Sequence, residues 1–159
     1  MPIIDICNRK IVTLQPDDTV VQATKMMRQF HVGAVVVTEE KNGKRVPVGI
    51  VTDRDVVVGV IAPELDPNVM TVGDIMVANL AIVDEDSGIF EAIQLMSNKG
   101  VRRLPVVRKN GELVGIVTLD DLFVMVTKEL GSFSKLLIKE HLASQYQPTH
   151  HFYAPLANA

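Results

Sequence analysis

The sequence VGIVTDRD at residues 48–55 recurs as VGIVTLDD at residues 114–121, with six of the eight positions identical at an offset of 66. Upstream, DDTVVQATKMM from Asp17 aligns with DSGIFEAIQLM from Asp86 at an offset of 69. A segment that recurs in this way indicates a chain built from duplicated structural units. We therefore predict two copies of one unit, over residues 7–60 and 73–127. Residues 61–72 join the copies, and residues 128–159 follow them as a tail.

Hydrophobic periodicity predicts the same order of elements in both copies. Apolar residues recur at helical spacing over residues 20–30 and 89–98, and a short β-prone run precedes each helix, at residues 11–14 and 80–83. Two apolar strands follow, over residues 34–38 and 48–51 in one copy and 104–107 and 113–117 in the other. An Asn-Gly pair separates the two strands of each copy and predicts a type I′ hairpin. A helix that begins at TDRD or TLDD closes each copy. The predicted fold is α/β, with tandem β-α-β-β-α repeats.

Composition and charge exclude several classes of protein. Hydrophobic residues make up 47% of the 159 positions but aromatic residues only 4%, which predicts an aliphatic core. The net charge is −3 and no long basic run is present, so we expect no nucleic-acid partner. The longest apolar run, near residues 56–62, is too short to cross a membrane, and the N-terminal residues do not follow the order of a secretory signal. With Cys7 as the single cysteine, we expect a cytoplasmic protein.

The GIVTxxD motif and the strand RLPVV at residues 103–107 resemble the CBS domain. The resemblance extends over both copies, and VGDIMV at residues 72–77 resembles the short helix that commonly leads into a CBS copy. In that family two tandem copies pack through their sheets into one pseudo-twofold unit, often called a Bateman module. Pairing has a physical reason, because a single copy of this size would leave an apolar sheet face uncovered.

The Thr and Asp of each GIVTxxD motif have two interpretations. Their spacing is that of a capping box, in which Thr caps a helix and the carboxylate three residues later faces free N–H groups. The same carboxylate can accept two hydrogen bonds from a ribose diol, and the Thr hydroxyl can bond a sugar or a phosphate. The resemblance implies that Thr52, Asp55, Thr118 and Asp121 hold the ribose and phosphate of adenine nucleotides. The two interpretations are compatible.

In the family each cleft combines the Thr and Asp of one copy with the first strand and the xxLPV strand of the other. The resemblance therefore implies that Arg54, Arg102 and Arg103 meet Thr52 and Asp55 in one cleft, which would prefer phosphate-bearing ligands. For Arg102 and Arg103 a solvated surface pair is the alternative. The other cleft would hold Thr118, Asp120 and Asp121 against residues 32–35 (Val32, Gly33, Ala34, Val35), without an arginine. This cleft would suit an uncharged adenosine or no ligand.

An apolar slot for the adenine ring is also implied by the resemblance. The segments that would supply it are residues 11–12, residues 80–82, Val101 and Pro105, and they include the candidate contacts Val12 and Ala81.

These observations predict a regulatory or sensor module without catalytic activity. AMP, ADP or ATP fits best, with NAD or S-adenosylmethionine as other ligands of the family, and no cofactor or metal is required. We expect a homodimer and a regulated protein that the sequence does not identify. One alternative is a structural dimerisation scaffold, in which GIVTxxD only caps helices and no small molecule binds. A fragment of an enzyme related to IMP dehydrogenase ranks last, because the chain lacks the length and the cysteine loop of a barrel.

The remaining features carry less information. An apolar stripe from Leu130 to Leu142 predicts a short amphipathic helix in the tail. We expect the final segment to be extended, with Phe152 and Tyr153 docked on another subunit, or disordered. His31 is expected to cap a helix or lie on the surface, and the other histidines lack the partners of a metal site.

Overall fold

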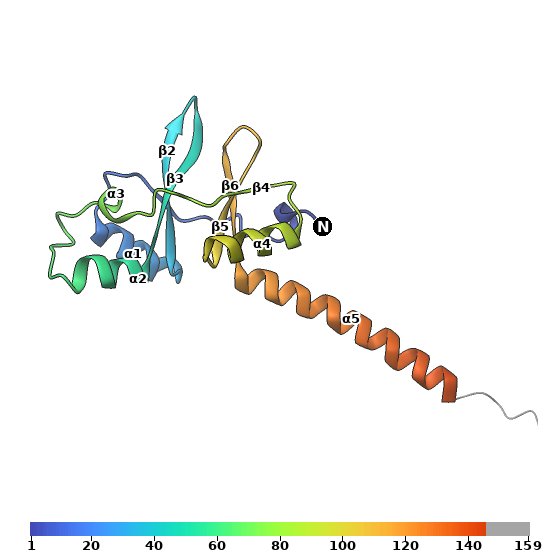
Figure 1. Cartoon of the computed structure of the whole chain (residues 1–159). Coiled ribbons are helices and arrows are strands. Elements are labelled where there is room, and N and C mark those ends of the chain that lie inside the picture. The colour runs from blue at the N-terminus through green and yellow to red at the C-terminus, as the bar shows by residue number, and fades with distance from the viewer. Residues whose placement is uncertain (146–159) are drawn as a thin grey trace, which may run out of the picture. The chain divides into compact units, whose positions relative to one another are not determined.

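The computed structural model describes residues 1–145 and divides into two compact units, residues 1–123 and the segment from Val124 onward. Both repeats lie in the first unit, and each contributes a three-stranded sheet (Figure 1). The first sheet contains β1 (Thr13–Leu14), β2 (Ala34–Lys41) and β3 (Lys44–Thr52). The second contains β4 (Val83–Asp84), β5 (Arg103–Val107) and β6 (Leu113–Thr118). In each sheet the short first strand, β1 or β4, runs parallel to the central strand, β2 or β5. The central strand and the last strand form an antiparallel hairpin. The predicted order of elements is confirmed.

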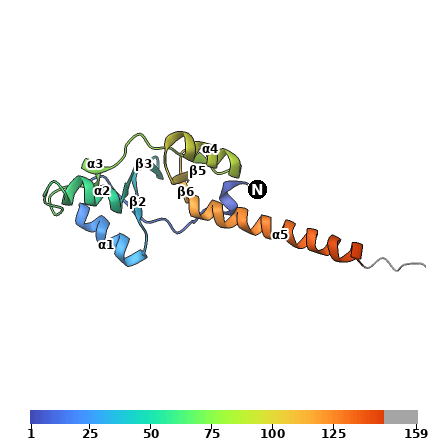
Figure 2. The same ribbon diagram turned by 60° about the horizontal axis from the view of Figure 1, so that its bottom comes forward.

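The helices begin and end where the sequence supplies capping residues. Helix α1 (Val20–Phe30) begins at Thr19, which forms a capping box with Gln22, and ends at His31, whose φ of 52° is left-handed. Helix α4 (Ile89–Lys99) ends in the same way at Gly100. Figure 2 shows α1 and α2 (Asp53–Val56) beside the first sheet and α4 beside the second. Helix α2 continues as a π-helical segment, η2 (Val57–Ile61).

The helix that precedes each repeat packs on the sheet of the other repeat. The 3₁₀ helix η1 (Ile3–Asp5) places Ile3 in the core of the second sheet, whereas α3 (Val72–Ile75) places Val72 in the core of the first. Asn8 bridges Ile116 of β6, and Val77 bridges Ile50 of β3. Asn8 and Val77 are equivalent positions at the offset of 69, and Ile50 and Ile116 are equivalent positions at the offset of 66. The two bridges therefore correspond to each other and give the unit its pseudo-twofold arrangement. We call the segments that carry Asn8 and Val77 the exchanged segments, because each packs on the sheet of the other repeat.

Cys7 lies on this exchanged segment. Its side chain packs against Gly115 of β6 in the second repeat. Burial raises the pKa of the Cys7 thiol above its ordinary value of 9.0.

The two hairpin turns differ. In the first, Asn42 and Gly43 both have positive φ, 54° and 72°, which confirms the type I′ prediction. In the second only Gly111 has positive φ, so the same prediction is wrong there. Its N–H donates to the Arg108 carbonyl at 2.8 Å, and the Arg108 N–H donates to the Glu112 carbonyl at 2.9 Å. This three-residue loop is a type I turn followed by a left-handed glycine, because the second hairpin has one more loop residue than a type I′ turn accepts.

The predicted short tail helix is part of a longer element. Helix α5 (Leu119–Gln145) begins at Thr118 and continues for 27 residues, so the closing helix of the second repeat and the tail helix are one. Its apolar residues from Leu130 to Leu142 are exposed. Phe152, Tyr153, His150 and His151 lie outside the described residues. Within residues 1–145, no helix combines the length and the hydropathy needed to cross a membrane.

Candidate functional site: two clefts between the repeats

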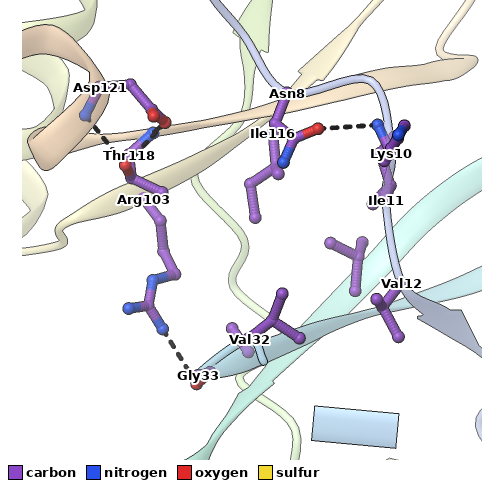
Figure 3. A pocket seen from close by; sticks show the side chains of 12 residues that line it. Asn8, Lys10, Ile11, Val12, Val32, Gly33, Arg103, Ile116, Thr118 and Asp121 are labelled. Carbon is purple, nitrogen blue, oxygen red and sulfur yellow. Dashed lines mark hydrogen bonds between the residues drawn. The ribbon is translucent and has the colours of Figure 1, made fainter. Parts of the chain in front are cut away.

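The first cleft, which we call the Thr118 cleft, has a volume of about 210 Å³ and is lined by residues of both repeats (Figure 3). Thr118 and Asp121 come from the end of β6 and the start of α5. The first repeat contributes the apolar residues Ile11, Val12, Val32 and Ala34 together with Gly33. The structure thus brings together most of the residues that the sequence assigned to this cleft.

The second cleft, the Thr52 cleft, has a volume of about 420 Å³ and occupies the equivalent place. Thr52, Arg54 and Asp55 come from the end of β3 and the start of α2. Val101, Arg102 and Arg103 come from the second repeat, as expected. Of the two clefts between the repeats, the Thr52 cleft is the one whose volume lies in the range of roughly 300–1,000 Å³ that is usual for small-molecule sites.

The Thr and Asp of each cleft form a complete capping box. The Thr52 N–H and hydroxyl both donate to Asp55 Oδ2 at 2.8 Å, and the Asp55 N–H donates back to the Thr52 hydroxyl at 3.2 Å. The second repeat repeats this geometry, with bonds of 2.9, 2.7 and 3.2 Å between Thr118 and Asp121. The structural interpretation of GIVTxxD is therefore confirmed, and the capping bonds orient a carboxylate and a hydroxyl at the wall of each cleft.

Arg103 lies at the contact between the repeats rather than on the surface. Its Nη1 donates to the carbonyl of Gly33 in the other repeat at 3.1 Å (Figure 3). Its Nε is buried and has no hydrogen-bond partner among the described residues, an arrangement that costs roughly 1–3 kcal/mol. Arg103 lines the Thr118 cleft as well as the Thr52 cleft, so the expectation that the Thr118 cleft lacks an arginine is wrong.

Arg102 differs from its neighbour. It lines only the Thr52 cleft and is exposed, and its guanidinium forms an ion pair with Asp120 at 3.6 Å. The exposure of both side chains, 73% and 85%, makes this pair a weak contributor to stability. Asp120 was expected in the Thr118 cleft, but the structure does not place it in the lining. Arg102 is therefore a solvated side chain at the edge of the Thr52 cleft, whereas Arg103 is partly buried between the repeats.

Several expected residues line neither cleft. Ala81 packs against the core of the second repeat, and Pro105 is buried within β5. Val35 is fully buried in the core of the first repeat. The position of Val35 follows from strand alternation, because Ala34 and Val36 on either side of it line the Thr118 cleft and every second side chain of a strand points to the opposite face.

The clefts also contain residues that the sequence did not indicate. Asn8 and Lys10 reach the Thr118 cleft from the exchanged N-terminal segment, and Val77 reaches the Thr52 cleft from the equivalent segment after α3. Ile116 and Ile50 line the two clefts from the hairpins. The sequence could have indicated both isoleucines, because each occupies the third position of the repeated VGIVT. The packing of each exchanged segment on the other repeat is not visible in the local sequence, because it depends on contacts between segments that are far apart in the chain.

Neither cleft has the donors of a metal centre. Among the described residues, no group of three or more His, Cys, Asp or Glu side chains is placed to hold a metal ion.

Comparisons with known proteins agree with this architecture. The model of the CBS domain family matches residues 3–61 and 72–127. An uncharacterized protein of Methanopyrus kandleri is 39% identical over 118 residues, 74% of this chain and 59% of that protein. The chain thus spans less than two thirds of that relative.

Several solved structures are similar to this chain. The crystal structure of Hypoxic Response Protein I, with two coordinated zinc ions, has a TM-score of 0.68 and 32% identity, and the match covers 77% of this chain and 96% of that one. A CBS domain protein from Pyrobaculum aerophilum complexed with AMP has a TM-score of 0.69 and 27% identity, covering 76% and 89%.

Proposed function

This chain belongs to the CBS domain family, and on that premise we propose that its two clefts bind adenine nucleotides and that it acts as a regulatory module without catalytic activity. The observation that carries the proposal is the duplication of one site. Both clefts place the Thr and Asp of one repeat opposite a strand of the other repeat. The related Pyrobaculum protein, solved as a complex with AMP, supports a nucleotide as the ligand.

Each residue has a chemical role in the proposal. The capping bonds end on Oδ2 of Asp55 and Asp121, so the other carboxylate oxygen is assigned to the ribose hydroxyls. Arg54, Arg102 and Arg103 are assigned to the phosphates in the Thr52 cleft, because guanidinium groups bind phosphate through paired N–H donors. The isoleucine and valine side chains of each cleft are assigned to the adenine ring.

Binding between two repeats also gives a mechanism for regulation. A ligand that contacts both repeats favours the relative arrangement in which those contacts are best, and it shifts the population of the module accordingly. We further propose that the module forms homodimers and passes this shift to a regulated protein in the cytoplasm. AMP, ADP and ATP are the leading ligands, and NAD and S-adenosylmethionine are included in the test.

A dimerisation scaffold is the second candidate function, and the complete capping boxes favour it. In that case Thr52, Asp55, Thr118 and Asp121 stabilise helix starts and no nucleotide binds.

Calorimetric titration of the whole chain with AMP, ATP, NAD and S-adenosylmethionine tests the proposal. We expect AMP to bind and Asp55→Asn to weaken binding in the Thr52 cleft about tenfold or more, since Asn retains an acceptor for the helix cap but loses the charged acceptor for ribose. Asp74→Asn is the matched control, because Thr71 and Asp74 form the same capping box in α3 and line neither cleft. No binding of any of these ligands at millimolar concentration would contradict the proposal.

A further inference from the structure

Arg103 is the one residue in the described part of the chain that lines both clefts. Its backbone lies at the start of β5 in the second repeat, and its side chain extends to Gly33, just before β2 of the first repeat (Figure 3). Gly33 lines the Thr118 cleft but not the Thr52 cleft. The hydrogen bond to Gly33 therefore places the guanidinium beside a residue of the Thr118 cleft.

The carbonyl of Gly33 connects this arginine to the second cleft. It accepts one hydrogen bond from Arg103 Nη1 and another from the backbone N–H of Asp53, each at 3.1 Å. Asp53 lines the Thr52 cleft, at the start of α2. A displacement of the guanidinium from Gly33 thus changes a hydrogen bond at the point where the two clefts adjoin.

Arg103 determines whether each cleft has a net positive charge. The Thr118 cleft contains Lys10 and Asp121 besides Arg103, so without this arginine its formal charges cancel. In the Thr52 cleft, Arg54 and Arg102 likewise cancel Asp53 and Asp55. Each cleft has an excess positive charge only when Arg103 is assigned to it, and one guanidinium cannot neutralise a phosphate in both clefts.

We propose that the two clefts share Arg103, so that a phosphate-bearing ligand in one cleft weakens the binding of a second phosphate-bearing ligand in the other. This inference rests on the proposed function and adds a regulatory property to it. The antagonism is specific to the phosphate, because a nucleoside without phosphate does not require the guanidinium. By thermodynamic linkage each cleft must weaken the other by the same factor.

The test compares the intact chain with chains in which one cleft is weakened. At AMP concentrations that leave the weakened cleft mostly empty, Asp55→Asn reports the Thr118 cleft and Asp121→Asn reports the Thr52 cleft; we call these the single-cleft chains. If the clefts are independent, the two dissociation constants of AMP in the intact chain equal the dissociation constants measured in the two single-cleft chains. We expect instead that the second AMP binds about tenfold more weakly than its single-cleft constant, within the 5–150-fold range usual for coupled sites. Adenosine, the phosphate-free probe, should show no such difference.

Variants at Arg103 identify the source of the antagonism. Arg103→Met should weaken AMP binding in both clefts and abolish the difference between intact and single-cleft chains. Arg103→Lys keeps one shared charge and should preserve the difference, which separates charge sharing from a general loss of structure. Arg102→Met is the matched control, because Arg102 lines one cleft only; it should weaken one cleft and leave the antagonism intact.

The outcomes separate this inference from the proposed function. The inference is overturned if the AMP constants of the intact chain match the single-cleft constants, if Arg103→Met retains the antagonism, or if only one of the two single-cleft chains binds AMP. In the first two cases the nucleotide-binding function of both clefts stands, and in the third it stands for one cleft only. Binding of neither AMP nor adenosine to any chain overturns the proposed function and this inference together.

Discussion

Two glycines allow a segment of one repeat to lie directly on a strand of the other. A Cβ atom on Gly115 would overlap the Sγ of Cys7, and one on Gly49 would overlap the Sδ of Met76. Both contacts hold the exchanged segments that carry Asn8 and Val77 to the clefts. At these positions glycine is required for a close approach and not for an unusual backbone conformation.

Alanine at these glycines should destabilise the module. Gly49→Ala should cost about 1–3 kcal/mol in the free energy of unfolding, because the new methyl group would also lie 2.9 Å from the Cβ of Met76, which cannot rotate away. At Gly115 the Cys7 Cβ is 3.2 Å away, so Cys7→Ala should partly restore the stability of Gly115→Ala. Urea denaturation measures these changes.

The control for this prediction is Gly131→Ala in α5. Nothing lies within 4 Å of a Cβ at that position, and alanine favours helix, so stability should not fall. Unchanged stability in Gly49→Ala and Gly115→Ala would show that the exchanged segments do not pack as described.

The residues of the candidate site were predictable to different degrees. Thr52, Asp55, Thr118 and Asp121 follow from a local motif whose turn geometry is set by a few neighbouring residues. The direction of Arg103 was not predictable, because a long side chain selects its conformation from partners that the tertiary structure supplies, here the carbonyl of Gly33. Lys10 was missed because it reaches the Thr118 cleft by the exchange of segments.

At the level of elements, the same Thr-x-x-Asp capping box begins three helices within residues 1–145, and two of these boxes line the Thr52 and Thr118 clefts. In α3, the Thr71 N–H donates to Asp74 Oδ2 at 2.8 Å, and the Asp74 N–H donates to the Thr71 hydroxyl at 3.2 Å. The bond from the Thr71 backbone lowers the pKa of Asp74 below its ordinary value of 3.8. The capping box therefore gives α3 a stability that depends on pH.

The direction of this dependence follows from the lowered pKa. Asp74 is more acidic in the folded than in the unfolded chain, so its contribution is complete above the unfolded pKa and is lost as the pH falls through the folded pKa. We expect Asp74→Asn to lower stability at pH 7 and to make the decline of stability below about pH 4 less steep. Urea denaturation at pH 7 and pH 3 measures both effects. A decline as steep as that of the wild type would contradict this role of Asp74.

The elements also show where sequence patterns succeed and fail. Helix α1 has the predicted bounds because Thr19 and His31 fix its two ends locally. The extent of α5 was missed because the apolar stripe alone did not indicate continuity, although the absence of a proline between the closing helix of the second repeat and the tail favours one helix. The second hairpin turn was misjudged because the Asn-Gly pair fits more than one loop length.

For the whole molecule, the repeat in the sequence determines more than the number of sheets. The exchange of η1 and α3 means that neither repeat has a complete core without a segment that precedes the other. Both clefts lie where the repeats adjoin, so a ligand that occupies either one stabilises the contact between the repeats. Binding and folding of the module are therefore coupled, and a ligand specific to the native state must raise the melting temperature.

The melting temperature of the whole chain as a function of AMP concentration tests the central claim, that the clefts are nucleotide sites. A ligand at about 100 times its Kd adds about 2.7 kcal/mol per site, which raises Tm by several degrees in a chain of this size. We expect this rise in the wild type and in the Asp74→Asn control. In a chain that carries both Asp55→Asn and Asp121→Asn the rise should fall to about half or less, because a site weakened tenfold or more adds at most about 1.4 kcal/mol at the same AMP concentration. A Tm that does not respond to AMP, ATP or NAD at millimolar concentration would contradict the account and favour a scaffold whose GIVTxxD motifs only cap helices.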